Sequence, residues 1–141
     1  MASNRVYIDH LRRVSLFEPF TRKDLEKIAQ ASDEVAVLAG SVILHQGTEG
    51  HEAYVILSGR VVVKRNGRKV ATLGAGAILG ELSLLDHGER SATATCETDC
   101  SLLVLTQRTF LAVVKDVPLL AHKLLASLAA RIRELDNLSL S

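Results

Sequence analysis

The sequence is poor in the residues that mark secreted, fibrous or disordered chains. Its 141 residues include two cysteines, two prolines and nine glycines, and tryptophan is absent. Two cysteines are too few for the disulfide framework that supports small secreted domains. With 48% hydrophobic and 23% charged residues, the composition is globular. A chain of this length is expected to form a single domain, residues 1–141, with its own core.

Neither sign of charge dominates. Lys and Arg number 17 and Asp and Glu 16, which gives a formal net charge of +1. This balance gives no broad electrostatic reason to expect DNA, RNA or an anionic membrane as a partner. Residues 1–5 lack the apolar core of a signal peptide, and no uncharged run approaches the ~20 residues of a membrane span. We therefore expect a cytoplasmic protein that itself contacts neither nucleic acid nor membrane, and in which any anion binding is local.

Cysteine and histidine do not occur at metal-ligand spacing. Cys96 and Cys100 flank Glu97–Asp99, which is typical of a turn between two strands, so free buried thiols are expected and a cross-turn disulfide is the alternative. The histidines are dispersed, without the paired spacing of a cupin-type metal enzyme: His10, His45, His51, His87 and His122. No metal site and no catalytic residue is predicted.

The chain begins with helical patterns and then changes to strand patterns. Residues 1–33 hold an amphipathic segment over 4–13 and a capping-box motif, Thr21–Asp24, at the start of a second helix. From Glu34 to Thr106, short β-rich runs alternate with glycines, and Asn66-Gly67 between two of them is a strong hairpin signal. Short strands at this regular spacing predict an antiparallel sandwich or jelly roll.

Two helices are expected after the strands. Thr106 is a candidate N-cap for the first, and Pro118 suits the start of the second, which should run to about Asn137. The second helix carries an apolar stripe with heptad-like steps: Ala121, Leu125, Leu128, Ile132 and Leu135. This stripe can pack on the sheet or form a dimer seam, and both alternatives stay open.

The stretch Gly80–Thr93 carries the chemistry of the chain. Gly80 permits close backbone approach, and Glu81–Leu85 can form one helical turn with unpaired N-terminal N–H groups. Arg90 supplies a permanent charge and a planar fork suited to phosphate oxygens. Glu81 is expected to accept hydrogen bonds from neighbouring hydroxyls. Phosphate plus hydroxyl recognition indicates a nucleotide, whereas the alternative is a simple surface ion pair between Glu81 and Arg90.

This stretch also resembles a known family. Gly80-Glu81-Leu82-Ser83-Leu84 followed by Arg90-Ser91-Ala92-Thr93 is similar to the phosphate-binding cassette of cyclic nucleotide-binding domains. Such domains occur in bacterial catabolite activator regulators, protein kinase A regulatory subunits and cyclic-nucleotide-gated channels. Gly40–Gly47 and Gly59 match further family segments. The resemblance implies a β-roll over 34–106 with its cassette at 80–93, and hinge and lid helices over 107–141.

The resemblance implies a role for each matching residue. The implied phosphate-binding residues are Arg90, Ser91, Leu82 and Ser83, the last two through backbone N–H groups. The implied ribose-binding residues are Glu81 and Gly80. Base contacts are expected at strand and lid positions, namely Val63, Val70, Ala71, Leu135 and Asp136.

Two positions bear on ligand choice. Glu89 replaces the proline that commonly precedes the arginine, which places a carboxylate next to the phosphate site. Ser91 stands where cGMP-preferring relatives often carry Thr and many cAMP binders carry Ala. The catabolite regulators use Ser there and respond to cAMP, so the resemblance favours cAMP, with cGMP as the alternative.

The sequence therefore predicts a non-enzymatic sensor with a mainly β fold, an eight-stranded antiparallel jelly-roll barrel or sandwich with N-terminal helices and two C-terminal helices. Ligand capture is expected to move the C-terminal helices, and the last helix is expected to bind a second copy or another protein. No cofactor is expected besides the cyclic nucleotide. The alternatives are a structural or dimerisation module whose pocket no longer binds nucleotide, and an excised regulatory domain of a channel or transcription regulator that responds to cGMP.

Overall fold

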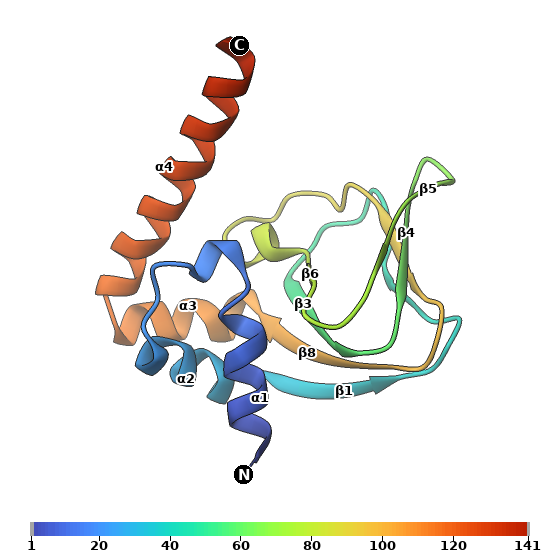
Figure 1. The fold of residues 1–141 in the computed structure, drawn as a ribbon, viewed down its shortest axis with the longest axis horizontal. Helices are drawn as coiled ribbons and strands as arrows, with labels where there is room; N and C mark the ends of the chain where they lie inside the picture. The colour runs from blue at the N-terminus through green and yellow to red at the C-terminus, as the bar shows by residue number, and fades with distance from the viewer. Residues whose placement is uncertain (1, 141) are drawn as a thin grey trace.

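Two antiparallel sheets and a layer of helices make up the fold (Figure 1). The computed structural model describes residues 2–140, with side chains described for residues 5–137. The helical elements are α1 (Ala2–Leu11), η1 (Ser15–Phe17), α2 (Arg22–Gln30), η2 (Glu81–Leu84), α3 (Gln107–Asp116) and α4 (Leu119–Leu140). The strands are β1 (Asp33–Val37), β2 (Val42–Leu44), β3 (Glu52–Ser58), β4 (Val61–Arg65), β5 (Arg68–Leu73), β6 (Ile78–Leu79), β7 (Thr93–Cys96) and β8 (Cys100–Thr106).

The sheets face each other around an apolar interior. One has the strand order β1-β8-β3-β6 and the other β2-β7-β4-β5. Side chains from both sheets form one buried cluster, which includes Leu44, Ile56, Val61, Ala94 and Leu102. Alternate residues of each strand point inward, so short β-branched runs suffice to fill this space. The predicted mainly β fold with flanking helices is confirmed.

The strand boundaries follow local turn chemistry. Asn66 and Gly67 both adopt positive φ, 54° and 80°, as a two-residue hairpin between β4 and β5 requires. Strand β7 begins at Thr93, directly after the stretch that holds Arg90 and Ser91. The two-residue strand β6 was not predicted, because Ile78–Leu79 is too short to show a strand period and is defined by its pairing with β3.

The helices cover the sheet that contains β3 and β8, and a second buried cluster joins them to it. Phe17 stacks on Phe20 and Phe110, with ring centroids 5.1 and 5.9 Å apart. Leu84 of η2 belongs to the same cluster as Phe110 and Leu120. The core of the helical layer therefore extends to the short helix at residues 81–84.

Capping residues start the helices where the sequence predicted. Thr21 and Asp24 form a reciprocal capping box at α2, with Asp in the acidic position. Thr106 caps α3 by accepting a hydrogen bond from the Thr109 N–H at 3.2 Å. Val117 leaves the helical region ahead of Pro118, which separates α3 from α4.

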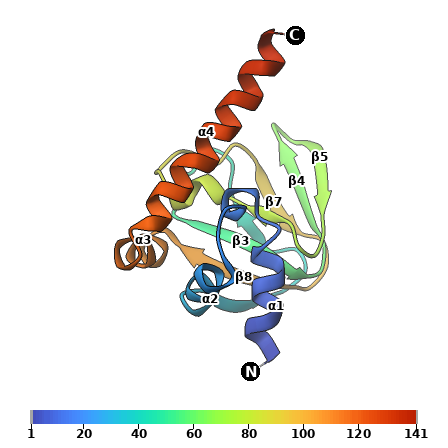
Figure 2. The same cartoon turned by 60° about the vertical axis from the view of Figure 1, so that its left-hand side comes forward.

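Helix α4 packs on the body with its first turns and then extends beyond the rest of the molecule (Figures 1 and 2). Leu120 and Leu124 are buried, whereas Leu125, Ile132 and Leu135 are 66–67% exposed. The apolar face of this helix is therefore divided between core packing and a stripe that solvent reaches.

No disulfide joins the two cysteines of the chain. Cys96 and Cys100 are free and buried, as predicted. Burial, followed by the Cys100 thiol, raises the pKa of Cys96 to about 11, which keeps it protonated. Among residues 2–140, no helix combines the length and the apolar character that a membrane crossing requires.

Candidate functional site

Gly80 sets the geometry of the turn that leads into η2. Its φ and ψ of 71° and 28° lie in the left-handed region, which a residue with a side chain rarely adopts. A Cβ there would also lie 3.0 Å from the Glu52 carbonyl oxygen and would collide with Nη1 of Arg90. Glycine is thus required both by the turn and by the closeness of Arg90.

The Arg90 guanidinium is held at two points. Nη1 donates to Oγ of Ser83 at 2.8 Å, and Nη2 donates to the Glu52 carbonyl oxygen at 2.8 Å. The backbone is held as well, because the Arg90 N–H donates to the Thr48 carbonyl at 2.7 Å and the Gly47 N–H donates to the Arg90 carbonyl at 2.9 Å. These bonds keep a permanent positive charge in one position without a ligand.

Tyr54 supports this arrangement from β3. Its hydroxyl donates to Oε1 of Glu52 at 2.6 Å. Burial first, and then this hydrogen bond, raise the pKa of Tyr54 above its ordinary value, and the positive charge of Arg90 opposes them. Tyr54, Glu52 and Arg90 therefore form a chain of contacts from the core to the loop.

Glu81 is paired with helix α4 and not with Arg90. Its Oε1 accepts a hydrogen bond from Nη2 of Arg131, and the two side chains are 21% and 28% exposed. Oε2 of Glu81 is buried and has no hydrogen-bond partner among the described residues. An unpaired buried acceptor costs free energy, so Glu81 retains capacity for a donor such as a hydroxyl group.

Gly80, Glu81, Ser83 and Arg90 line a cavity of about 420 Å³, within the ~300–1,000 Å³ range of small-ligand pockets. Its lining is Leu44, Val63, Arg65, Ile78, Leu79, Gly80, Glu81, Leu82, Ser83, Glu89, Arg90, Ser91 and Ala92. The structure thus brings together all six residues expected at the phosphate and the ribose. Glu89, the departure from the family pattern, is exposed at the same cavity.

The residues expected to contact the base do not all line this cavity. Val63 lines the cavity, whereas Val70 on β5 is 51% exposed and lies outside the lining, as does its neighbour Ala71. Leu135 is 66% exposed on α4, next to Asp136. Their roles stay predictions.

The backbone N–H of Ser83 is already bonded within the protein. Ser83 donates its N–H to the Gly80 carbonyl at 3.0 Å, which closes the turn of η2. Its hydroxyl accepts from Arg90 instead. Ser83 thus acts here through its side chain on the guanidinium, a contact that the sequence did not reveal.

Two arginines at the site escaped prediction. Arg65, at the end of β4, lines the cavity, and its Nε donates to the Ser91 carbonyl at 3.2 Å. Arg131 reaches Glu81 from α4. The only signal for Arg131 in the sequence is its place in the helix one turn before the expected lid residue Leu135.

The site can hold a small anion that also carries hydroxyl groups. Arg90 is fixed, Arg65 adds a second cation, and Glu81 offers an unpaired oxygen beside them. Charge-assisted hydrogen bonds from a guanidinium suit phosphate oxygens, and a carboxylate suits a sugar hydroxyl.

Known proteins resemble this chain in sequence. A family model described as cyclic nucleotide-binding domain matches residues 34–116. The cyclic AMP receptor protein of Thermus thermophilus is 44% identical over 102 residues, which are 69% of this chain and 47% of that protein. The cAMP-dependent protein kinase regulatory subunit of Schizosaccharomyces pombe is 33% identical over 106 residues, 74% of this chain and 26% of that protein.

Solved structures extend the similarity to the fold. The N-terminal domain of a transcriptional regulator from Streptomyces coelicolor A3(2) superposes with a TM-score of 0.84 at 32% identity, covering 92% of this chain and 96% of that one. The catabolite activator protein of Thermus thermophilus superposes with a TM-score of 0.70 at 38% identity, covering 89% of this chain and 62% of that one. The chain spans about half or less of the length of the curated relatives it matches.

Proposed function

This chain belongs to the cyclic nucleotide-binding domain family, and we propose that it is a sensor module that binds cAMP in the cavity beside Arg90. One observation carries the proposal. Ser83 and Glu52 fix the guanidinium at a cavity whose lining includes Glu81, and one carboxylate oxygen of Glu81 has no hydrogen-bond partner among the described residues. A cyclic phosphate and a ribose 2′-hydroxyl present complementary groups to these two side chains.

In the proposed complex, Arg90 and Ser91 bind the cyclic phosphate, together with the backbone near Leu82. Ser83 contributes through the hydroxyl that holds Arg90, because its N–H bonds the Gly80 carbonyl. Glu81 accepts a hydrogen bond from the ribose 2′-hydroxyl, with the Gly80 backbone alongside. The base lies toward Val63, and the remaining base contacts come from Val70, Ala71, Leu135 and Asp136. Those four do not line the cavity in this structure, so they reach the base only through a movement of β5 or α4.

Two observations favour cAMP over cGMP. Ser91 is the residue that the resemblance associates with cAMP-responsive regulators. A relative that is 44% identical to this chain carries cyclic AMP in its name. Relatives named as cGMP-dependent protein kinases match at 21–36% identity, so cGMP is the comparison ligand in the test below.

Ligand binding is proposed to change the position of α4. Glu81 joins the cavity to α4 through Arg131, and Leu84 joins η2 to the cluster that holds Phe110, Leu120 and Leu124. A ribose hydroxyl at Glu81 competes for the carboxylate that Arg131 binds. Such a switch requires that the two positions of α4 differ in ligand affinity.

We propose that the domain has no enzymatic activity of its own and that α4 transmits the effect of ligand binding to a partner. Its exposed apolar residues offer a contact surface to a second copy or to another protein. No direct contact of this chain with nucleic acid or membrane is part of the proposal, and a cytoplasmic location accords with a cytosolic second messenger.

A thermal-shift comparison with cAMP, cGMP and AMP tests the function. Binding at 100 times Kd adds about 2.7 kcal/mol to the stability of the folded state. We expect cAMP to raise the Tm most, cGMP less and AMP least, because AMP lacks the cyclic phosphate. Equal shifts with cGMP would overturn the cAMP preference. No shift with either cyclic nucleotide would favour a structural module whose pocket does not bind nucleotide.

A further inference from the structure

A second group of polar side chains converges outside the cavity. Nδ1 of His87 lies 3.3 Å from Nδ1 of His51 and 3.2 Å from Oε1 of Glu49. Nε2 of His51 lies 4.0 Å from the same carboxylate oxygen. One ligand atom from each residue falls within 4.8 Å of the other two. His51 and His87 are 36 residues apart in the chain, which is why the sequence showed no paired spacing.

The backbone holds these residues in place. The Gly50 N–H donates to the Gly88 carbonyl at 3.2 Å, and Glu49 forms a bridge with Glu89. The Gln107 N–H donates to the His51 carbonyl at 2.8 Å. The two segments that carry the side chains are thus locked together, so the convergence does not depend on the side chains alone.

Nδ1 of His87 has two possible hydrogen-bond partners. Nδ1 of His87 faces an imidazole nitrogen and a carboxylate oxygen at nearly equal distances. A neutral His87 has at most one hydrogen on that nitrogen, which can point to only one of them. A cation among the three groups would satisfy all of them together.

The distances fit a particular kind of cation. Zn–N and Zn–O bonds of 2.0–2.1 Å place two tetrahedral ligand atoms about 3.3–3.4 Å apart. The two separations at Nδ1 of His87, 3.3 and 3.2 Å, are close to that edge, whereas Nε2 of His51 lies 4.0 Å from Oε1 of Glu49. The exposed side chain of His51 must therefore turn for one of its nitrogens to join the other two ligand atoms. We propose that Glu49, His51 and His87 form a binding site for Zn²⁺ or a similar divalent transition-metal ion.

The donor set supports this choice of metal. Imidazole nitrogens suit zinc, copper and nickel, whereas magnesium and calcium prefer oxygen ligands throughout. The side chains of Glu49, His51 and His87 are 53%, 61% and 61% exposed. An ion can therefore enter directly from solvent and keep water in its remaining positions.

A bound ion would cross-link the loop that carries Glu49 and His51 to the loop that carries His87, next to the phosphate site. His51 precedes Glu52, whose carbonyl holds Arg90, and His87 lies in the segment that leads to Arg90. The ion would rigidify both supports of the guanidinium. This inference does not rest on cyclic nucleotide binding, because the metal is measured without nucleotide.

The test uses the whole chain without a polyhistidine tag and freed of metal by a chelator. Zn²⁺ is titrated by calorimetry, and Co²⁺ by its visible absorption. We expect one equivalent to bind in the wild type. In His51→Ala/His87→Ala the affinity should fall by more than the roughly 10–100-fold that loss of an outer-shell partner costs. The matched control, His45→Ala/His122→Ala, removes two exposed histidines elsewhere and should bind like the wild type.

Three results would overturn the proposal. The first is no saturable binding to a wild-type protein that is shown to be folded by circular dichroism. The second is equal affinity in the cluster and control variants. The third is a cobalt–thiolate charge-transfer band, which would assign the metal to Cys96 or Cys100 instead.

Discussion

Protein groups hold Arg90 in place, because Ser83 and Glu52 each accept a hydrogen bond from one of its terminal nitrogens. A group that is already ordered loses little conformational entropy on binding. The residue therefore acts as a preorganised anion receptor. Its contribution depends on its neighbours as much as on its charge.

Arg90→Ala should weaken cAMP binding ten- to a hundredfold, since a hydrogen bond to a charged group contributes about 1.5–3 kcal/mol. Arg90→Lys should recover only part of the loss, because lysine keeps the charge but not the planar fork. Titration calorimetry measures both. Unchanged affinity in the alanine variant would remove Arg90 from the site.

Gly50→Ala should disturb the same arginine without touching its charge. The new Cβ would lie 2.6 Å from Cζ of Arg90 and would also collide with Oγ of Ser83. We expect a lower Tm and weaker cAMP binding. The matched control is Gly74→Ala, where a Cβ meets nothing within 4 Å, and thermal shift with and without cAMP compares the two variants. Equal behaviour of both would show that Gly50 is not needed to seat Arg90.

The sequence predicted which residues belong to the site better than it predicted the contacts that they make. Arg90 and Glu81 could be predicted because a phosphate and a hydroxyl restrict the residue types that bind them. Arg131 could not, since its approach to Glu81 depends on how α4 packs. Likewise, the hydroxyl of Ser83 could not be assigned to Arg90 before the turn of η2 was known.

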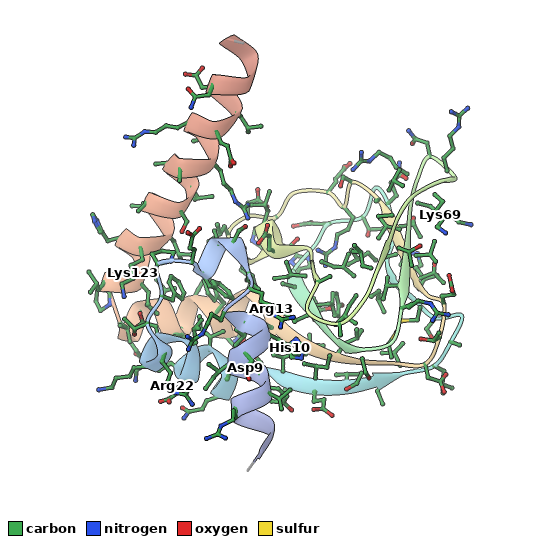
Figure 3. The ribbon with its side chains drawn as sticks, viewed as in Figure 1. Asp9, His10, Arg13, Arg22, Lys69 and Lys123 are labelled. Atoms are coloured by element: carbon green, nitrogen blue, oxygen red, sulfur yellow. The ribbon has the colours of Figure 1, made fainter. Side chains whose placement is uncertain are left out.

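The helical elements are tied to one another by two ion pairs of α4. Lys123 contacts Asp24 of α2 at 2.6 Å, with the two side chains 18% and 13% exposed. Figure 3 shows Lys123 on the helical side of the molecule, far from Lys69 of β5. The second pair joins Arg131 to Glu81. One pair fixes the start of α4 and the other its middle.

The pair at Asp24 should make stability depend on acid. Burial tends to raise the pKa of Asp24, but hydrogen bonds from Lys123 and Thr21 outweigh it and lower the pKa from 3.8. The stabilisation is therefore present above pH 3.8 and is lost as the pH falls through the lower, folded-state pKa. Asp24→Asn should flatten the fall in unfolding free energy on acidification. Urea unfolding at several pH values measures the unfolding free energy of both proteins.

Asp9→Asn serves as the control for that experiment, because it alters an exposed carboxylate of α1 (Figure 3). Its acid dependence should follow the wild type. If Asp24→Asn follows the wild type too, the hydrogen bonds of Asp24 do not stabilise the fold.

Arg131→Met should loosen the middle of α4. The change leaves the Glu81 carboxylate without its partner, at a cost of roughly 1–2 kcal/mol, between the values for exposed and buried pairs. Hydrogen exchange of the backbone should speed up in α4 beyond Leu128 and in η2. Arg133→Met, at an exposed arginine of the same helix, should leave the exchange rates unchanged. Faster exchange in both variants alike would trace the effect to the helix and not to the contact with Glu81.

Elements with a local signal were predictable, and those defined by pairing were not. Thr21, Thr106 and Asn66-Gly67 mark their elements through nearby hydrogen bonds and dihedral angles. Ile78–Leu79 becomes a strand only because β3 lies beside it. The division of α4 between buried and exposed leucines also depends on tertiary packing, which is why the sequence left both uses of its stripe open.

The whole molecule presents an apolar stripe on a helix that projects from its body (Figure 2). If the stripe is a dimer seam, the chain should self-associate, and Leu125→Glu/Ile132→Glu should return it to a monomer. Light scattering coupled to gel filtration gives the mass. Ala126→Glu adds charge on a different side of the helix and should not change the mass. A wild type that stays monomeric at high concentration would show that the stripe is not a dimer seam. It would favour another protein as the partner of this stripe.

The contact chain from Tyr54 through Glu52 to Arg90 also gives the molecule an optical property. Because the sequence has two tyrosines and no tryptophan, its tyrosine emission comes from Tyr7 and Tyr54 and no tryptophan emission overlies it. A carboxylate that accepts the phenol hydrogen quenches tyrosine emission, and both tyrosines make such a bond, Tyr7 to the distant Glu34. The positive charge of Arg90 acts on the Tyr54 hydroxyl, so an anion that neutralises this charge would alter the emission of Tyr54 but not that of Tyr7. Occupancy of the cavity should then be readable from the intrinsic emission of the protein, without a dye.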